Sequence, residues 1–390
     1  MTERSKAPRG CQGGFQMAID TATDGPEVPF MKSGTMVPVS QQKHLITAEV
    51  DVVPEEWKVS LEDRPEVSTF EYIDIPSIDL SLLETDRAEL VRRLRTTATD
   101  WGICRLINHG ISPELMKEVE TQGMKFFGQS SQEKLKLLKH GNGNAYYTGI
   151  NTEERRHSLH WAESFVMKFG LWKTLDLDAI NGCTIDWATA DDNFRKSLLE
   201  FMIGLKSLSE KILQLFAESL GLKADFYSDI LESGGLASRW NYYPVCPEPG
   251  EVLGAHSHTD PNFLTILQQD KVGGLQVEKD GRWYNVQPME GTLVLNIGDL
   301  FQIWTNGIFK SVLHRVLVNG SVSRISVAWL LYPRSSQSLS PPEELVDEKH
   351  PRMYRELMVE EYHQKVLTER LARQDSKVFN GQNLIDSLTI

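Results

Sequence analysis

The sequence predicts an α+β fold, in which a helical N-terminal part leads into a double-layered β structure. Two observations carry this prediction. Between about residues 85 and 220, apolar residues recur at the spacing of amphipathic helices. From about residue 237 to 333, the chain becomes short apolar segments separated by turn residues. So many strands within about 100 residues favour a sandwich or a double-sheet jelly roll.

Composition excludes several classes of function. The chain has 390 residues, 40% of them hydrophobic, and a formal net charge of −13. A nucleic-acid partner is not expected, because phosphate binding needs clustered Lys and Arg. No apolar stretch approaches the roughly 20 residues that span a bilayer, so no membrane association is expected either. The four cysteines form no CxxC pair, which fits a cytoplasmic protein, with nuclear presence left open.

The first half divides into a leader and a helical region. Residues 1–52 mix Gly, Ser, Thr and Gln without a sustained period, which predicts a mobile leader. A helical region is expected over residues 53–222. It opens with a short strand within 70–80, and three helices are expected near 86–102, 108–127 and 190–220.

The second half is expected to hold the β structure, over residues 236–334. Within it, Asp280-Gly281 predicts a tight hairpin, because this pair supplies the positive φ values of a type I′ turn. Residues 335–390 form a C-terminal extension with a helix near 352–371, which we expect to pack on the β domain.

Potential metal ligands gather in "GAHSHTDPNFLTIL". His256, His258 and Asp260 alternate before an apolar run, so in a strand all three would share a face. His314, in the apolar segment "KSVLHRVLVNG", is the candidate for a further ligand. Two imidazoles and one carboxylate can build the facial triad of non-haem Fe(II) enzymes. The residues alone leave open which of the first three would bind.

A candidate anion site follows in "SRISVAWLLYP". Arg324 and Ser326 lie two apart, and a guanidinium beside a hydroxyl suits a carboxylate. An arginine inside the β domain needs an anion to offset its desolvation. The alternative is a structural salt bridge at the rim of the domain.

Several segments together resemble the plant-type Fe(II)/2-oxoglutarate-dependent dioxygenases. They are "WGICRLINHGISPELMKEV", "NYYPVCPEPG", "HTDPNFLTILQQDKVGGLQV", "NIGDLFQIWTNGIFKSVLHRVLVN" and "RISVAW", and the resemblance covers roughly residues 53–370. It implies a double-stranded β-helix, or jelly roll, as the core. The implied iron ligands are His258, Asp260 and His314, with His256 outside the triad at the pocket rim. The residues implied to hold 2-oxoglutarate are Arg324, Ser326, Tyr243 and Asn241.

The resemblance also implies a reaction. The expected enzyme uses Fe(II), 2-oxoglutarate and O2, with ascorbate supporting activity, and it releases succinate and carbon dioxide. We expect it to hydroxylate a small, mostly apolar, carboxylate-bearing metabolite such as a gibberellin-type diterpenoid acid, with auxin, jasmonate and flavonoid substrates left open. The expected pocket residues are Tyr147, Phe165, Leu330 and His256.

Two other classes compete with this enzyme. "G-x-H-x-H" resembles the cupin signature, which would suggest a binding protein, but the glutamate expected soon after it is missing. A dioxygenase fold that has lost its activity is the other class, and the intact triad and R-x-S segment count against it. The sequence does not indicate an oligomeric state.

Overall fold

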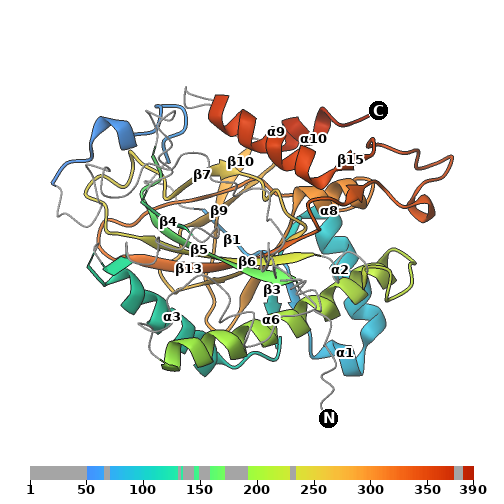
Figure 1. The fold of residues 1–390 in the computed structure, drawn as a ribbon, viewed down its shortest axis with the longest axis horizontal. Helices are drawn as coiled ribbons and strands as arrows, with labels where there is room; N and C mark the ends of the chain where they lie inside the picture. The colour runs from blue at the N-terminus through green and yellow to red at the C-terminus, as the bar shows by residue number, and fades with distance from the viewer. Residues whose placement is uncertain are drawn as a thin grey trace, which may run out of the picture.

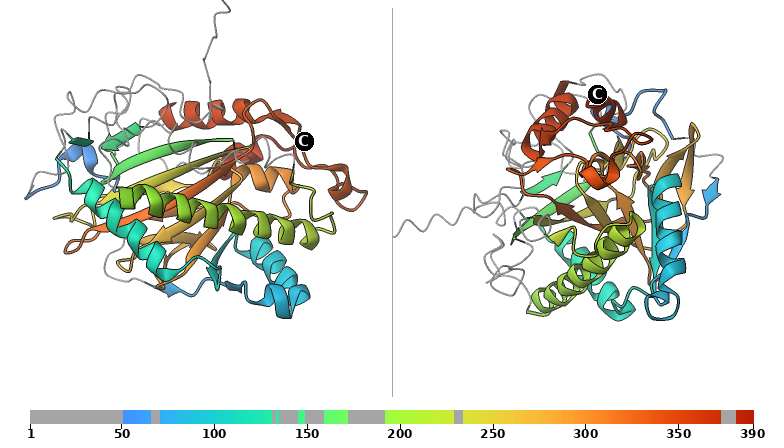
Figure 2. Two further views of the ribbon diagram at one scale, coloured as in Figure 1. Left: turned by 60° about the horizontal axis from the view of Figure 1, so that its bottom comes forward. Right: turned by 90° about the vertical axis from the view of Figure 1, so that its right-hand side faces the viewer.

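The computed structural model describes residues 51–65, 71–130, 133–134, 145–148, 159–171, 192–228, 234–372 and 381–390. The leader predicted over 1–52 lies outside this part of the chain, apart from residues 51 and 52. The predicted α+β class is confirmed: two β-sheets lie between helices on opposite sides (Figures 1 and 2).

Two sheets make up the centre of the molecule. The larger has eight strands in the order β2-β3-β11-β8-β13-β6-β5-β4, and the smaller has five in the order β1-β10-β9-β12-β7. The strands of the larger sheet are β2 (Ser77–Asp79), β3 (Ile103–Ile107), β11 (Leu293–Ile297), β8 (Leu264–Gln269), β13 (Arg324–Tyr332), β6 (Gly235–Tyr243), β5 (Glu163–Leu171) and β4 (Ala145–Thr148). Those of the smaller are β1 (Tyr72–Ile73), β10 (Arg282–Val286), β9 (Leu275–Lys279), β12 (His314–Val316) and β7 (Ala255–His258).

The two sheets pack face to face through apolar side chains. Leu267 and Val294 of the larger sheet join Leu275 and Val277 of the smaller sheet in one buried cluster. Alternate residues such as Ile266 point the other way, into the cluster formed with the helices. The larger sheet therefore has an inner face toward the smaller sheet and an outer face under the helices, as in a jelly roll.

Three long helices cover the outer face (Figure 2). They are α2 (Arg87–Asp100), α3 (Pro113–Phe127) and α6 (Asp192–Ser219), and the one-turn helix α1 (Leu82–Thr85) precedes them. Asp86 caps α2 by accepting from the Glu89 N–H, and Ser112 caps α3 by accepting from the Leu115 N–H. All three lie where the sequence predicted them.

The predicted hairpin is also confirmed. Lys279 of β9 pairs with Arg282 of β10, and both residues between them have positive φ, 53° at Asp280 and 77° at Gly281. A type I′ turn requires this pair of angles, and Gly adopts the second one without steric cost.

The division into a helical half and a strand half is less sharp than predicted. The helical region supplies β2 to β5 to the larger sheet, and the strand region contains the buried helix α8 (Asp299–Trp304). The sequence did not predict β3, because four of its five residues are buried and the strand lacks the alternation of apolar and polar residues. Among the described residues, two 3-10 turns lie in the loops, at Glu55–Trp57 and Glu343–Leu345.

The predicted C-terminal helix begins later than expected. Residues 352–358 include strand β15 (Leu357–Met358), which pairs with β14 (Ser338–Leu339), and the helix α9 runs from Val359 to Ala372. A short helix α10 (Gly381–Asp386) follows, and both lie across the strands from α3 and α6 (Figure 1). In the part of the chain that the structure describes, none of the helices combines the length and the apolar composition of a membrane span.

Candidate metal and cosubstrate site

Three potential metal ligands meet at neighbouring strands of the smaller sheet. His258 ends β7 and pairs directly with His314, which opens β12, and Asp260 follows two residues after β7. Asp260 Oδ1 lies 3.8 Å from His258 Nε2 and 3.7 Å from His314 Nε2. One donor atom from each residue lies within 4.8 Å of the others. Antiparallel pairing thus brings together residues 56 positions apart in the sequence.

Backbone carbonyls fix the tautomers of both imidazoles. His258 Nδ1 lies 2.7 Å from the His256 carbonyl oxygen, and His314 Nδ1 lies 3.1 Å from that of Val312. A carbonyl only accepts, so each Nδ1 carries a proton, and in the neutral ring that binds a metal each Nε2 would carry the lone pair. The lone pairs of two such nitrogens and a carboxylate oxygen would repel one another unless a cation lay between them. Two imidazoles and one carboxylate are the ligands of iron in a facial triad.

Asp260 provides the negative charge of this cluster. Burial raises the pKa of Asp260, but the imidazoles of His314 and His258 and hydrogen bonds from Thr265 and Asn296 outweigh that effect, so its pKa lies below the ordinary value. Asn296 Nδ2 donates to Asp260 Oδ2 at 3.3 Å. The carboxylate is therefore ionised and held by a neighbouring amide.

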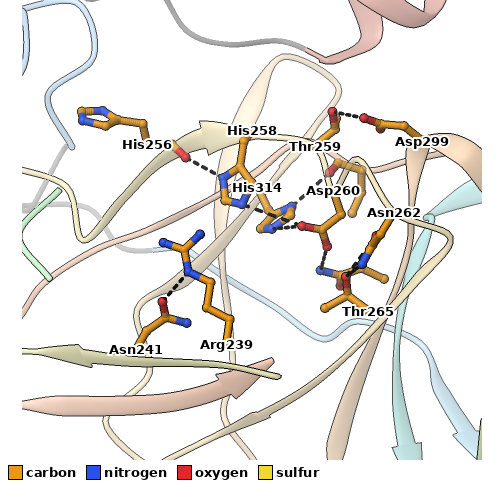
Figure 3. Close-up of polar contacts among 12 residues, drawn as sticks. Arg239, Asn241, His256, His258, Thr259, Asp260, Asn262, Thr265, Asp299 and His314 are labelled. Atoms are coloured by element: carbon orange, nitrogen blue, oxygen red, sulfur yellow. Dashed lines mark hydrogen bonds and ion pairs between the residues drawn. The ribbon is translucent and has the colours of Figure 1, made fainter. Parts of the chain in front are cut away.

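His256 takes part through its backbone rather than its ring. Figure 3 shows its imidazole turned away from the other three side chains, while its carbonyl oxygen accepts from His258. The ring packs against that of His160, with centroids 4.6 Å apart. The cupin arrangement, in which both histidines of G-x-H-x-H bind the metal, does not match this geometry.

The loop that carries Asp260 is held by the C-terminal helix. The Asp299 N–H donates to the Asp260 carbonyl at 2.8 Å, and Tyr362 of α9 donates to Asp299 Oδ2 at 2.8 Å. Thr259 donates to the same carboxylate oxygen at 3.1 Å (Figure 3). His363 Nε2 lies 2.7 Å from the Pro261 carbonyl. Sequence reasoning missed this support, since only the fold brings α9 to the loop.

Burial also changes the chemistry of Asp299. It raises the pKa of this carboxyl to about 7, although hydrogen bonds from Ser311, Tyr362 and Thr259 oppose the rise. The group lies at the first position of α8, where a helix N-terminus favours a carboxylate. Asp299 therefore takes the role of a hydrogen-bonded link rather than of a second strongly anionic metal ligand.

The predicted cosubstrate residues lie together on the inner face of the larger sheet. Arg324 pairs with Tyr243, and Ser326 pairs with Asn241, across β13 and β6. Arg324 is only 2% exposed, and its guanidinium lies 4.8 Å from the centroid of the Tyr243 ring. All four side chains thus face the gap between the sheets, as their strand parity requires.

Arg324 has no directly paired carboxylate in the described structure, although its charge opposes the burial that raises the pKa of Asp270. Its terminal nitrogens donate to Ser326 Oγ at 3.4 Å and to Gln269 Oε1 at 3.2 Å, and its Nε has no hydrogen-bond partner. None of the described carboxylates forms an ion pair with it, so the predicted alternative of a rim salt bridge is not supported. A buried guanidinium in this state is costly unless an anion binds it.

A second inner-face arginine was missed by sequence reasoning. Arg239 precedes Asn241 by two residues on β6, and its Nε donates to Asn241 Oδ1 at 2.9 Å (Figure 3). Ser164 Oγ of β5 donates to the same oxygen at 2.9 Å. The alternation of Arg239, Asn241 and Tyr243 was the signal that could have revealed it.

The predicted pocket residues have different outcomes. Leu330 lies on the inner face, where it pairs with Ala237 and shares a buried cluster with it. The prediction for Phe165 is wrong: it pairs with Trp240 on the outer face and packs against Phe126, with ring centroids 4.8 Å apart. The backbone of Tyr147 pairs with Ser164 in β4, and its side chain lies outside the described part of the structure.

Comparison with known families agrees with this geometry. Residues 235–333 match the 2OG-Fe(II) oxygenase superfamily, and residues 75–176 match the N-terminal region described as non-haem dioxygenase in morphine synthesis. The first match contains all seven residues expected to bind iron or 2-oxoglutarate, and the second covers most of the predicted helical region.

Individual relatives extend over nearly the whole chain. Flavanone 3-dioxygenase 2 of Oryza sativa subsp. japonica is 31% identical over 344 residues, which cover 87% of this chain and 98% of the relative. Gibberellin 20 oxidase 1 of Arabidopsis thaliana is 30% identical over 345 residues, covering 87% and 91%. The crystal structure of JOX2 in complex with 2OG, Fe and JA superposes with a TM-score of 0.73 at 28% identity, covering 91% of this chain and 98% of that one.

These matches span both halves of the molecule and include the segments that form the three-ligand cluster. The chain therefore belongs to the 2OG-Fe(II) oxygenase superfamily, among the 2-oxoglutarate-dependent dioxygenases of plants.

Proposed function

We propose that His258, Asp260 and His314 bind the catalytic Fe(II), and that Arg324 and Ser326 bind the distal carboxylate of 2-oxoglutarate. The observation that carries this proposal is a buried guanidinium that forms no ion pair with a described carboxylate, together with three convergent ligand atoms. Each feature requires a charged ligand of the opposite sign. Together they match a dicarboxylic keto acid that binds a metal at one end.

The remaining residues orient this ligand. Asn241 Oδ1 accepts two hydrogen bonds, so the amide is fixed and its Nδ2 stays available for a carboxylate or keto oxygen. The Tyr243 ring supports the Arg324 guanidinium from one side. When bound, iron and 2-oxoglutarate supply the oxidising power from O2, with succinate and carbon dioxide as coproducts.

We infer that the substrate is a small, mostly apolar plant metabolite that carries a carboxylate, and that hydroxylation is the main outcome. Apolar side chains at Val166, Ala328 and Leu330 share the inner face with Arg239, so an apolar body and an anion are both accommodated. Gibberellins, named in one relative, are carboxylic acids, whereas flavanones, named in another, are not. A gibberellin-type acid is our first candidate, followed by auxin, jasmonate and flavonoid compounds.

Two further parts of this proposal concern the reductant and the cellular compartment. We propose that ascorbate supports turnover by keeping the iron ferrous, and that the enzyme works in the cytoplasm, where thiols such as Cys104 and Cys246 stay reduced. Succinate formation with and without ascorbate tests the first, and imaging of a fluorescent fusion tests the second.

The experiment is an anaerobic reconstitution followed by exposure to O2. Purified protein is titrated with Fe(II) and 2-oxoglutarate, and succinate is then measured with gibberellin-type acids, indole-3-acetic acid, jasmonic acid and naringenin. We expect one equivalent of iron per chain and succinate formation that at least one acid stimulates. Failure to take up iron, or equal succinate formation with and without every compound, would contradict the proposal.

A further inference from the structure

The segment of residues 53–64, which precedes the first strand, is fastened to the loop between β6 and β7. Figures 1 and 2 show it in blue at one end of the molecule. The Val59 N–H donates to the Glu251 carbonyl at 2.9 Å. The carboxylate of Glu251 lies 3.1 Å from Lys58 Nζ and 2.9 Å from Arg64 Nη1. This loop follows Tyr243 directly, so the segment is attached to the part of the chain that carries a proposed cosubstrate residue.

Trp57 is the buried anchor of the segment. It is only 2% exposed, and its ring packs edge-on against that of Trp161, with centroids 5.6 Å apart. Trp161 lies just before β5 and bonds to both ends of the loop. Its Nε1 donates to the Pro244 carbonyl at 3.2 Å, and its backbone N–H donates to the Leu253 carbonyl at 2.9 Å. The two tryptophans therefore fix the residues on either end of the loop that follows Tyr243.

The Tyr243 ring is confined within this arrangement. It belongs to the same buried cluster as Trp57 and Trp161. A Cβ at Gly254 would lie 2.5 Å from Tyr243 Cδ1 and 3.1 Å from Val318 Cγ1. The backbone of Gly254 does not have a positive φ, so the ring rather than the backbone conformation excludes a larger residue there. The tyrosine ring thus has little freedom to move.

The position of this ring matters for Arg324, the proposed anchor of 2-oxoglutarate. The guanidinium carbon lies 4.8 Å from the centroid of the Tyr243 ring. Its hydrogen bonds to Ser326 and Gln269 are 3.4 and 3.2 Å long, which is longer than the usual distance of about 2.9–3.0 Å. The aromatic contact is therefore a substantial part of what orients the guanidinium, and a bidentate bond to a carboxylate requires that orientation.

We propose that Trp57 is a positioning residue for the binding of 2-oxoglutarate. Through Trp161 it fixes the Tyr243 ring, and that ring in turn supports the Arg324 guanidinium. This inference rests on the proposed dioxygenase function, and it extends the cosubstrate site to a segment outside both sheets. Coupling between two binding events is reciprocal, so the cosubstrate should stabilise the docked form of residues 53–64 in return.

The first test compares Trp57→Ala with Trp57→Phe and with Leu61→Ala. Leu61 lies on the same segment and is 79% exposed, so its replacement controls for a change that leaves the buried rings intact. Each protein is loaded with Fe(II) in the absence of O2, and calorimetry gives its affinity for 2-oxoglutarate. The affinity for Fe(II) and the free energy of unfolding are measured separately, so that the binding data refer to folded protein.

We expect Trp57→Ala to weaken binding of 2-oxoglutarate about 3- to 30-fold, the range for residues that act through packed neighbours. Its affinity for Fe(II) should stay that of wild type. Trp57→Phe keeps an aromatic ring and should recover most of the loss, and Leu61→Ala should behave as wild type, as exposed substitutions usually do. A purely structural role for Trp57 predicts lower stability with unchanged binding of 2-oxoglutarate by the folded molecules. That result, or an equal loss of Fe(II) and 2-oxoglutarate binding, would overturn the inference.

A double-mutant cycle tests whether the effect passes through the tyrosine ring. Gly254→Ala intrudes on that ring and should also weaken binding of 2-oxoglutarate. In a Tyr243→Leu background the ring is absent, so Gly254→Ala and Trp57→Ala should both lose most of their effect. Independent effects would instead multiply to within about twofold, and this outcome would exclude the route through Tyr243.

Hydrogen exchange in the unaltered protein keeps the inference testable if the variants fold poorly. The Val59 N–H, bonded to the Glu251 carbonyl, reports on docking of the segment. In iron-loaded wild type this amide should exchange more slowly once 2-oxoglutarate saturates the site, whereas the Gly281 amide in the hairpin of the smaller sheet should not change. A wild type that binds 2-oxoglutarate without any change at Val59 overturns this inference alone. Failure of the wild type to bind Fe(II) or 2-oxoglutarate would instead contradict the dioxygenase function.

Discussion

Tyr362 of the C-terminal helix donates a 2.8 Å hydrogen bond to Asp299, whose own backbone N–H donates to the Asp260 carbonyl at 2.8 Å. A helix outside both sheets is thereby linked in two steps to a proposed iron ligand. Tyr362 and Asp299, which form this hydrogen-bonded series with Asp260, are fully buried. Water therefore does not replace a hydrogen bond of the series when a substitution removes it.

Tyr362→Phe is therefore expected to weaken iron binding. The ring still packs, but Asp299 loses one of its hydrogen bonds and the Asp260 loop loses a fixed neighbour. Loss of such outer support typically lowers metal affinity about 10- to 100-fold, and we expect the lower end of this range because Thr259 still donates to Asp299. Anaerobic Fe(II) titration measures the effect. Thr368→Ala, an exposed change on the same helix, serves as control, and equal affinity in the two variants would refute the link.

His314→Ala is expected to abolish iron binding and leave the fold intact. The side chain supplies one of three ligand atoms, and its Nδ1 bond to Val312 is local. His256→Ala is the matched control, because the carbonyl of residue 256 that orients His258 survives the substitution. Metal content after reconstitution and circular dichroism report on the two effects. Iron retained in His314→Ala, or lost in His256→Ala, would reverse the ligand assignment.

Arg324→Met is expected to affect binding and stability in opposite directions. Removing one partner of a buried charge pair costs roughly 2–5 kcal/mol, which corresponds to at least about a 30-fold weaker affinity for 2-oxoglutarate. Without the cosubstrate, the variant should melt at a higher temperature than wild type, because the wild-type guanidinium is buried without a directly paired carboxylate and its Nε has no hydrogen-bond partner. Thermal melts with and without 2-oxoglutarate measure both. A lower melting temperature in the absence of ligand would show that Arg324 is already satisfied.

His109 should make stability depend on pH away from the metal site. Burial lowers the pKa of His109 from its ordinary value of 6.5, although a hydrogen bond to Gly291 opposes this. The unfolded chain then binds the proton more readily, so stability is present above pH 6.5 and is lost as the pH falls through the folded-state pKa. His109→Gln, which can still bond to Gly291 and Ile111, should flatten the pH profile of the melting temperature between pH 7 and 5. An unchanged slope would contradict this.

The sequence was informative where the chemistry is local. Arg324 and Ser326 lie two apart within β13, so strand alternation alone puts both on one face. His258 and Asp260 are also two apart in the sequence, and they lie close together although β7 ends at His258. The Asp280-Gly281 hairpin was likewise predicted from its turn residues. These features need no knowledge of which strand pairs with which.

The errors concern features that depend on distant pairing. Phe165 was assigned to the pocket because its segment resembles one that contributes substrate contacts, but the register of β5 on β6 turns it to the helices. Arg239 lies on the inner face through the same register. Tyr362 and Asp299 are 63 positions apart, and no sequence pattern in either segment predicts their hydrogen bond. Only the assembled sheet and the docked helix determine these relationships.

The proposed iron site and the proposed anchor for the cosubstrate lie on different sheets. The two imidazoles belong to the smaller sheet, while Arg324 belongs to the larger one. Packed sheets are separated by about 10 Å, so a keto acid held at both ends acts as a brace across the sandwich. Its carbon chain must match that spacing, and a homologue one methylene shorter or longer would leave one end poorly seated. The spacing between the two sheets would thus select the cosubstrate by its length.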